Sequence, residues 1–312
     1  MRLLTGSHAH GTVGSMRVPV PTYVDSELVL DAPGAGEGWW AGGPSAVFDG
    51  TTWWLAYRLR RPVGQGRGYA NAVGRSSDGV HFETVCTLDR DAFGAESLER
   101  PALVRRPDGG WRIYVSCATP GSKHWRVDAI DAATPAEFDA GRRVPSMPGD
   151  TRTAVKDPVV HAPADGRPWR AWVCCHPLEQ PGAEDRMVTR LATSDDGLEW
   201  QLGAVVLAGR NGEWDQRGAR VSAVAPDASW AFYDGRATAE ENFEERAGWA
   251  LAATPDGPFE YAGGPIGSPH ARHGLRYVDA VALAGGDYRL YYESARPDGA
   301  HELRTEVVSG TV

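Results

Sequence analysis

The sequence is poor in lysine and has no long apolar run. Its two lysines, Lys123 and Lys156, stand among 32 basic residues, so arginine supplies nearly all the positive charge, and the net charge is −9. An acidic chain of this kind is poorly matched to nucleic acid or to an anionic membrane surface, and we expect neither as a partner. No apolar run approaches the roughly 20 residues of a membrane-spanning helix, and the first 37 residues lack the apolar core of a secretory signal.

Cysteine is scarce as well. The four cysteines are Cys86, Cys117, Cys174 and Cys175, and none of them has the CxxC spacing of a metal site. The adjacent pair lies in an expected strand, where neighbouring side chains point to opposite faces. We therefore expect buried free thiols in a cytoplasmic protein, with no metal and no cofactor.

The sequence does contain one pattern five times. The segments are GGPSAV from Gly42, ERPALV from Glu99, KDPVVH from Lys156, ARVSAV from Ala219 and RYVDAV from Arg276. Steps of 57, 57, 63 and 57 residues separate their third residues, which are Pro44, Pro101, Pro158, Val221 and Val278. A nearly constant period of this size is typical of repeat folds, in which each unit buries its apolar face against the next one.

Each repeat has the composition of two β-hairpins. Aromatic-rich runs, such as residues 53–57 and 111–115, follow Asp-Gly or Gly-Gly turns, and a second Asp-Gly turn follows in most repeats. Two hairpins make four antiparallel strands, which is one propeller blade, whereas a β-sandwich has no reason to repeat one motif at constant pitch. The sequence therefore predicts an all-β, five-bladed β-propeller over residues 38–312, with residues 1–37 as an N-terminal extension that packs on it.

Charged residues gather around the five repeated segments. Because the first strand of each blade lines the central channel, we expect these residues to converge although they are far apart in the sequence. The carboxylates are Glu99, Asp157 and Asp279, and the other polar groups are Arg100, Lys156, Arg220, Arg276 and Tyr277. Such a ring predicts either a polar site for a hydroxylated or anionic small molecule, or salt bridges that close the ring.

The Asp-Pro and Glu-Arg-Pro openings of these segments carry a resemblance. From about Gly38 to its end, the chain resembles the five-bladed glycoside hydrolases, which include arabinanase and xylosidase, invertase and levansucrase, and mannoside phosphorylase types. The resemblance implies that carboxylates from different blades cleave or transfer a glycosidic bond. It implies a catalytic or acid-orienting role for Asp157 in Lys-Asp-Pro, and it makes Glu99 in Glu-Arg-Pro a candidate acid.

The chain departs from that pattern in two blades. Gly42 and Gly43 stand where the first blade usually offers an aspartate, and residues 218–221 (GARV) replace the acidic segment of the fourth blade. Four other carboxylates are candidates to substitute for the absent acids: Asp234, Glu241, Asp279 and Glu293. Asp234 precedes a glycine and is equally well explained as a turn residue.

The basic residues support a second idea. A phosphate or carboxylate fits a group of guanidinium and ammonium side chains, so hydrolysis and phosphorolysis both stay open. The candidate anion-binding residues are Arg100, Lys156, Arg220, Arg236 and Arg276. The tryptophans of the second strands are expected to pack between blades. Trp39 and Trp40 follow a glycine-rich loop, and one of them, with Trp40 as the candidate, is expected to line the substrate funnel.

These features lead to one main interpretation and two alternatives. The main one is a glycoside hydrolase-like enzyme whose partner is a small carbohydrate or glycosylated metabolite, either neutral or anionic. The first alternative is a non-catalytic propeller that binds a sugar or an anionic metabolite, and the second is a protein-binding scaffold. The acidic loop over residues 236–248 is expected either to overhang the channel and set specificity or to be a solvated excursion.

Overall fold

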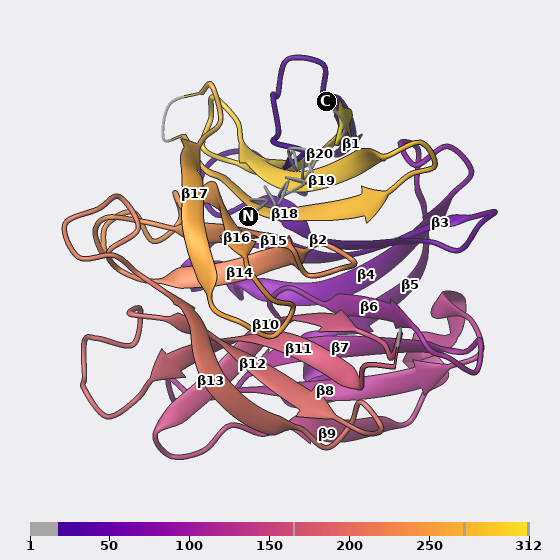
Figure 1. Cartoon of the computed structure of the whole chain (residues 1–312), viewed down its shortest axis with the longest axis horizontal. Coiled ribbons are helices and arrows are strands. Elements are labelled where there is room, and N and C mark those ends of the chain that lie inside the picture. Colours follow the sequence, from indigo (N-terminus) through magenta and orange to yellow (C-terminus); the bar gives the residue numbers. More distant parts are fainter. Residues whose placement is uncertain (1–17, 165, 271–272, 311–312) are drawn as a thin grey trace, which may run out of the picture.

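The fold is a ring of five blades, each made of four antiparallel strands (Figure 1). Single parallel bridges, Arg246 to Leu275 and Trp40 to His301, join the fourth, fifth and first blades into one 12-stranded sheet. The computed structural model describes residues 18–164, 166–270 and 273–310. The first strands of the blades are β2 (Trp40–Phe48), β6 (Ala102–Arg105), β10 (Thr153–His161), β14 (Ala219–Val224) and β18 (Leu275–Ala282). Each of these strands contacts the first strand of both neighbouring blades, and the contacts close into a ring around one axis. The predicted all-β, five-bladed propeller is therefore confirmed.

The remaining strands follow in order from the axis outward. The second strands are β3 (Trp53–Arg60), β7 (Trp111–Ala118), β11 (Trp169–Pro177), β15 (Trp230–Gly235) and β19 (Asp287–Ala295). The third strands are β4 (Gly68–Ser76), β8 (Trp125–Ala132), β12 (Val188–Ser194), β16 (Arg246–Ala252) and β20 (His301–Ser309). The outer strands are β5 (Glu83–Asp89), β9 (Arg143–Met147), β13 (Gln201–Ala208), β17 (Phe259–Ile266) and β1 (Glu27–Leu30). Short 3-10 helices lie in the connections: η1 (Val63–Gln65), η2 (Arg90–Phe93) and η3 (Pro135–Ala140).

The fifth blade combines the two ends of the chain. Strand β1 pairs antiparallel with β20, so that an N-terminal strand completes a blade made of C-terminal strands (Figure 1). Ahead of β1, the backbone N–H groups of Thr22 and Tyr23 donate to the Glu306 carboxylate at 3.0 and 3.1 Å. The ring is thus closed by hydrogen bonds between distant segments. Among the described residues, no helix is long and apolar enough to cross a membrane.

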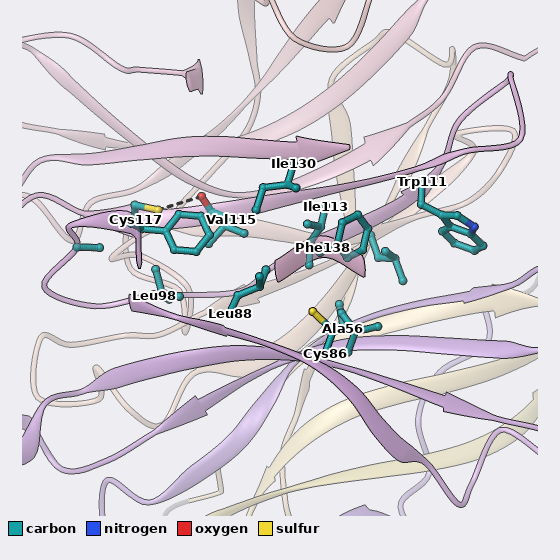
Figure 2. Packing of buried hydrophobic residues seen from close by; sticks show 14 residues of the cluster. Ala56, Cys86, Leu88, Leu98, Trp111, Ile113, Val115, Cys117, Ile130 and Phe138 are labelled. Atoms are coloured by element: carbon teal, nitrogen blue, oxygen red, sulfur yellow. Dashed lines mark hydrogen bonds between the residues drawn. The ribbon is translucent and has the colours of Figure 1, made fainter. Parts of the chain in front are cut away.

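Apolar side chains fill the space between adjacent blades in five clusters, one for each blade interface. Figure 2 shows the cluster between the first two blades, where Ala56 and Cys86 face Ile113 and Phe138. The tryptophans of the second strands belong to these clusters, as predicted: Trp54, Trp111, Trp169, Trp172 and Trp230. All four cysteines are buried and free, which confirms that expectation too.

The repeated sequence segment forms a β-bulge in four of the five first strands. The register against the second strand shifts between Gly42 and Ser45, and likewise in β10, β14 and β18. The residue before the repeat's third position is left-handed in three blades, with φ of 57° at Gly43, 49° at Asp157 and 53° at Tyr277. Because a bulge bends its strand and re-aims side chains, it directs Asp157 and Tyr277 toward the channel network described below.

Candidate functional site

A polar pocket opens at the mouth of the channel where the first strands begin. It has a volume of about 500 Å³, and an adjoining hollow adds about 160 Å³. The two spaces share six lining residues, which are Arg67, Trp125, Lys156, Arg220, Asn242 and Glu245. We refer to both spaces together as the mouth pocket. Its size suits a small molecule.

The floor of the mouth pocket is a chain of alternating carboxylates and guanidinium groups. Arg58 bridges two carboxylates, with Nη1 paired to Glu99 and Nη2 donating to Glu293 at 2.8 Å. Arg276 then bridges Glu293, at 2.8 Å, and Glu245, at 2.5 Å. This alternation compensates each buried charge with its neighbours.

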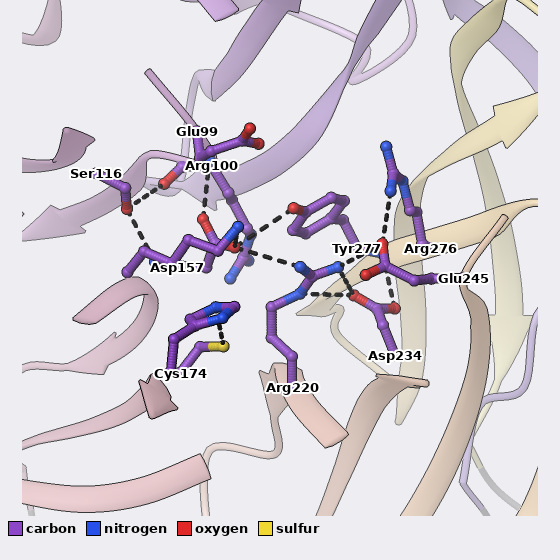
Figure 3. A network of polar contacts seen from close by, with 12 residues as sticks. Glu99, Arg100, Ser116, Asp157, Cys174, Arg220, Asp234, Glu245, Arg276 and Tyr277 are labelled. Carbon is purple, nitrogen blue, oxygen red and sulfur yellow. Dashed lines mark hydrogen bonds and ion pairs between the residues drawn. The ribbon is translucent and has the colours of Figure 1, made fainter. Parts of the chain in front are cut away.

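Arg220 continues the chain on the far side of Glu245 (Figure 3). Its Nη2 donates to Glu245 at 3.1 Å and to Asp234 at 3.0 Å, and its Nη1 donates to Asp157 at 3.4 Å. Asp157 also accepts from the Tyr277 hydroxyl at 3.3 Å. One guanidinium therefore holds carboxylates from the third and fourth blades together.

Glu245 is the most heavily paired carboxylate of this network. It accepts from Arg220, from Arg276 and from Arg236 Nη1, the last at 2.8 Å. Burial alone would raise the pKa of Glu245, but the three guanidinium groups hold that pKa well below its usual value. The pKa of Glu293 is lowered in the same way by Arg276 and Arg58 against the effect of burial. Both groups are therefore fixed as carboxylates and are unsuited to donate a proton.

Asp234 differs from these two groups. Burial raises the pKa of Asp234 to about 6, against the opposing effect of Arg220, and the nearby Glu245 charge adds to the rise. One of its oxygens accepts from the Tyr277 backbone N–H at 2.9 Å. Asp234 is fully buried and lies behind the lining of the mouth pocket.

Both lysines of this lysine-poor chain line the same pocket. Lys156 Nζ lies 3.5 Å from Asp157 Oδ2 and 4.9 Å from the centre of the Trp125 ring. Burial lowers the pKa of Lys156, while Asp157 opposes that shift. Lys156 therefore presents a partly desolvated amine beside an aromatic ring, which is an arrangement suited to an oxyanion next to a sugar face.

The lining of the mouth pocket is richer in basic than in acidic groups. The basic side chains are Arg58, Arg60, Arg67, Lys123, Lys156, Arg220, Arg236 and Arg276. The acidic ones are Glu96, Glu99, Glu184, Asp185 and Glu245. Three of the arginines, Arg58, Arg60 and Arg236, also keep a buried Nε–H group that has no hydrogen-bond partner among the described residues. Asp157, Asp234 and Glu293 lie behind this wall and pair with its basic groups, so the positive excess belongs to the surface of the pocket and not to the whole charge network.

The structure brings half of the predicted site residues to the mouth pocket. Those at its wall are Glu99, Lys156, Arg220, Arg236, Arg276 and Tyr277. Asp157, Asp234 and Glu293 lie fully buried behind that wall and reach the pocket through the arginines and Lys156. The loop over residues 236–248 contributes Asn242, Phe243 and Glu245, so it borders the channel rather than forming a solvated excursion.

Three predicted residues lie away from the mouth pocket. The side chains of Arg100 and Asp279 line a separate cavity at the opposite end of the channel, where Arg100 Nη2 lies 3.5 Å from Asp279 Oδ1. Trp40 is fully buried: its ring stacks on His301 at 4.6 Å and lies beneath Arg60 at 4.1 Å. The expectation that Trp40 lines the funnel is therefore corrected, and the aromatic wall is supplied by Trp125 instead.

Sequence inspection missed several residues of this site, among them Arg58, Arg60, Trp125 and Glu245. Arg58 and Arg60 end the second strand of the first blade, where they meet the beginnings of the first strands. The repeated sequence segment includes only the first strands, so no sequence pattern pointed to Arg58 and Arg60 in the second strand. Glu245 lies in the acidic loop over residues 236–248, where nothing in the sequence distinguishes it from the neighbouring glutamates.

Other side chains occupy the places of the first- and fourth-blade acids that the resemblance leads one to expect. The space beside Gly42 is occupied by the carboxylate of Glu293, which extends from the fifth blade. In the fourth blade, Arg220 stands in the repeated segment and is paired with three carboxylates. Within residues 18–164, 166–270 and 273–310, no cluster of His, Cys, Asp and Glu side chains is arranged to hold a metal ion.

Comparison with solved structures places this architecture among known proteins. A thermostable family-43 glycoside hydrolase has a TM-score of 0.65 and 18% identity, over 89% of this chain and 91% of that one. The family-43 enzyme from Xanthomonas citri, solved with xylotriose, has a TM-score of 0.61 and 16% identity over 90% of both chains. The chain has the fold of the five-bladed glycoside hydrolases.

Related propellers extend this likeness beyond one family. A structure from family 130, described as mannoside phosphorylases that include glycoside hydrolases of β-1,2 mannosidic linkages, has a TM-score of 0.58 and 14% identity. It covers 93% of this chain and 92% of its own. No protein-family profile and no curated protein sequence matches the chain. At these identities the likeness establishes the fold and leaves the individual family open.

Proposed function

We propose that this protein binds a small anionic carbohydrate, such as a sugar acid or a sugar phosphate, in the mouth pocket. The observation that carries the proposal is the excess of basic side chains in the lining, which includes both lysines of the chain, Lys123 and Lys156. An oxyanion pairs with such ammonium and guanidinium groups through charge-assisted hydrogen bonds. Trp125 offers an aromatic face beside Lys156 against which a sugar ring packs.

Lys156 provides the test of this proposal. Replacing Lys156 with glutamine keeps a similar length and removes the charge, so we expect glucose 6-phosphate to bind about tenfold more weakly or worse. Binding of glucose itself should change little, because the lost contact is to the phosphate. Isothermal titration calorimetry with both sugars measures the difference. The matched control is Arg75→Gln, which removes an exposed charge of β4 away from the pocket. Equal weakening of both sugars would contradict an anion-binding role for Lys156.

A second candidate function is phosphorolysis of a glycosidic bond. It is favoured by the position of Glu99, a carboxyl group at the pocket wall that faces the same space as Lys156 and Arg220. Because Arg58 holds Glu99 as a carboxylate, the proton in this mechanism comes from the bound phosphate and passes through Glu99 to the leaving oxygen as the glycosidic bond breaks. A phosphate oxygen held by the basic groups forms the new bond to the anomeric carbon, and Glu99 is left as the carboxylate that it was at the start. One protein carboxyl group is then enough, which fits a chain lacking the first- and fourth-blade acids.

The phosphorolysis candidate is tested by product analysis. The protein is incubated with inorganic phosphate and a panel of β-linked disaccharides, and sugar 1-phosphate is measured. We expect Glu99→Gln to lower the rate about 100-fold, because it removes the acid while keeping the shape of the side chain. Absence of sugar 1-phosphate and of free sugar from every disaccharide would dismiss the catalytic candidate and leave the binding proposal as it stands.

A further inference from the structure

The mouth pocket has two parts whose walls differ in exposure. The smaller part, of about 160 Å³, is lined by five buried residues that the larger part does not share: Arg58, Arg60, Glu99, Arg276 and Tyr277. The larger part, of about 500 Å³, has an exposed edge formed by Glu96, Gly121, Ser122 and Lys123. We refer to the smaller part as the inner hollow and to the larger part as the outer space. The outer space is thus the wide opening of the pocket, and the inner hollow is its deeper part.

The buried cations of the inner hollow differ in how well they are paired. Each of three arginines contacts two or more carboxylates, and these are Arg58, Arg220 and Arg276. Arg60 has one ion contact with a described residue, in which its Nη1 lies 3.9 Å from Glu99 Oε1. Lys156 Nζ also has one such contact, at 3.5 Å. Arg60 and Lys156 are therefore the buried cations of this wall with the fewest anionic partners.

The donors of Arg60 that remain free are accessible from the inner hollow. Its Nε is sealed inside the protein without a partner, whereas Nη1 and Nη2 are not sealed and make no hydrogen bond to a described residue. The guanidinium packs against two rings, with its Cζ 4.1 Å from the centre of the Trp40 ring and 4.8 Å from that of Phe243. These rings hold the group in place but supply no oxygen acceptor. Arg60 therefore presents an ordered fork of N–H donors to the hollow.

Arg60 keeps its charge in this position. Burial and the neighbouring charges of Arg58 and Arg276 lower the pKa of Arg60 to about 9, while Glu293 opposes the shift. The group is therefore still protonated near pH 7. An anion bound beside it would offset the repulsion from the other two arginines, which Glu99 at 3.9 Å offsets only in part.

We propose that the inner hollow holds the terminal oxyanion of a glycoside, with Arg60 as its main anchor, while the sugar ring and its aglycone extend into the outer space. This inference rests on the function proposed above and narrows its ligand to sugars that carry the anionic group at the end away from the glycosidic bond. A carboxylate or phosphate supplies the two oxygens that match a guanidinium fork. Lys156 and Trp125 line both parts of the pocket, so they lie where the sugar ring joins them.

The orientation follows from the shape of such a sugar. In a hexose with an oxyanion on C6, the anomeric carbon C1 lies across the ring from that group. With the oxyanion in the inner hollow, a substituent on C1 points toward the exposed edge of the outer space. A glycoside of a uronic acid or of a sugar 6-phosphate thus fits, whereas a chain extended from the anionic end meets the buried wall of Arg58 and Arg276.

Calorimetry on the unmodified protein tests the orientation. The probes are methyl and 4-nitrophenyl β-D-glucosides that carry either a C6 carboxylate or a 6-phosphate, with methyl β-D-glucopyranoside as the neutral counterpart. We expect at least one anionic methyl glycoside to bind about tenfold more tightly than the neutral one, and its 4-nitrophenyl analogue to bind within about threefold of it or more tightly. The tighter of the two anions identifies the carboxylate or the phosphate as the better ligand.

Two results would overturn the inference in different ways. A 4-nitrophenyl analogue bound at least about tenfold more weakly than its methyl glycoside would mean that the aglycone does not face the opening, and the anion-binding proposal would stand. Equal affinity for the neutral and both anionic glycosides would contradict the anion-binding proposal as well.

Variants of Arg60 test its role as the anchor. Arg60→Gln should weaken the better anionic methyl glycoside about 100-fold, and Arg60→Lys, which keeps the charge but loses the planar fork, about tenfold. The neutral glycoside should be affected by less than about threefold in both variants, which a merely structural role of Arg60 would not predict. The matched control is Arg61→Gln, which removes an exposed charge from the next residue. Wild-type affinity of either Arg60 variant for the anion, or equal weakening of the anionic and neutral glycosides, would remove Arg60 from the site. If neither variant folds, the comparison of ligands on the unmodified protein decides.

Discussion

Replacing Glu245 with glutamine should destabilise the protein by about 4 kcal/mol, because removing one member of a buried charge network leaves its partners uncompensated. Glu245 accepts from Arg220, Arg236 and Arg276, and these guanidinium groups then repel one another in a buried site. Urea unfolding followed by tryptophan fluorescence measures the effect as a lower midpoint at an unchanged slope.

The matched control is Glu260→Gln, which removes the same charge from an exposed position on β17 and should change the unfolding free energy by less than about 0.5 kcal/mol. If both variants unfold alike, the guanidinium groups around Glu245 are well solvated, and the floor of the mouth pocket is not a closed network. A large loss for Glu245→Gln alone would show that the loop over residues 236–248 is tied into the structural centre of the propeller.

The fold was predictable because its signal is repeated. Each blade has to bury apolar faces against two neighbours, so five copies of one segment at a nearly constant step predict five equivalent units. The turns and aromatic runs add a second, independent signal for four strands in each unit. The tryptophans are an example of a prediction that follows from the strand pattern. Trp111 and Trp230 lie between blades, as their positions in the second strands predict.

The site was only partly predictable, because one repeated segment spans both ends of the channel. Arg276 and Asp279 are three residues apart, which corresponds to about 10 Å along a strand. The first residue lines the mouth pocket, and the second lines a separate cavity at the opposite end of the channel. The sequence analysis placed both residues in one ring of charged groups and so combined two separate sites. The β-bulge between Arg276 and Asp279 breaks the regular alternation of side chains along the strand, and the sequence does not reveal it.

The partners of each charge were hidden for a different reason. Arg58 and Glu245 come from a second strand and from a loop, and they pair with residues of the fifth and fourth blades. The spacing of the repeats predicts that the first strands lie side by side. It does not predict which side chains of the second strands and loops pair with residues of those first strands. The carboxylates that the resemblance implied as catalytic were therefore found paired with arginine, and this pairing is what shifts our proposal from hydrolysis toward anion binding.

Gly42→Ala should destabilise the protein by about 3 kcal/mol. The first blade has no acid at this position because the space beside Gly42 is already filled by another side chain. A Cβ atom at this position would overlap the Glu293 carboxylate. That carboxylate has no room to move, since Arg58, Arg276 and His301 hold it at 2.7–2.8 Å. Overpacking at a rigid buried site costs roughly 1–3 kcal/mol and sometimes more, and the fixed charge network places this variant at the upper end.

Thermal unfolding of Gly42→Ala beside Gly64→Ala checks this expectation. A methyl group added at Gly64 would meet no described atom within 4 Å, and the backbone there is not left-handed, so this replacement should be neutral or slightly stabilising. An unchanged melting temperature for Gly42→Ala would mean that Glu293 can leave its place. In that case a first-blade aspartate could be restored by substitution. If the variant unfolds early, the fifth blade has taken over the space of the first-blade acid, and no single substitution at Gly42 can recreate a two-carboxylate hydrolase.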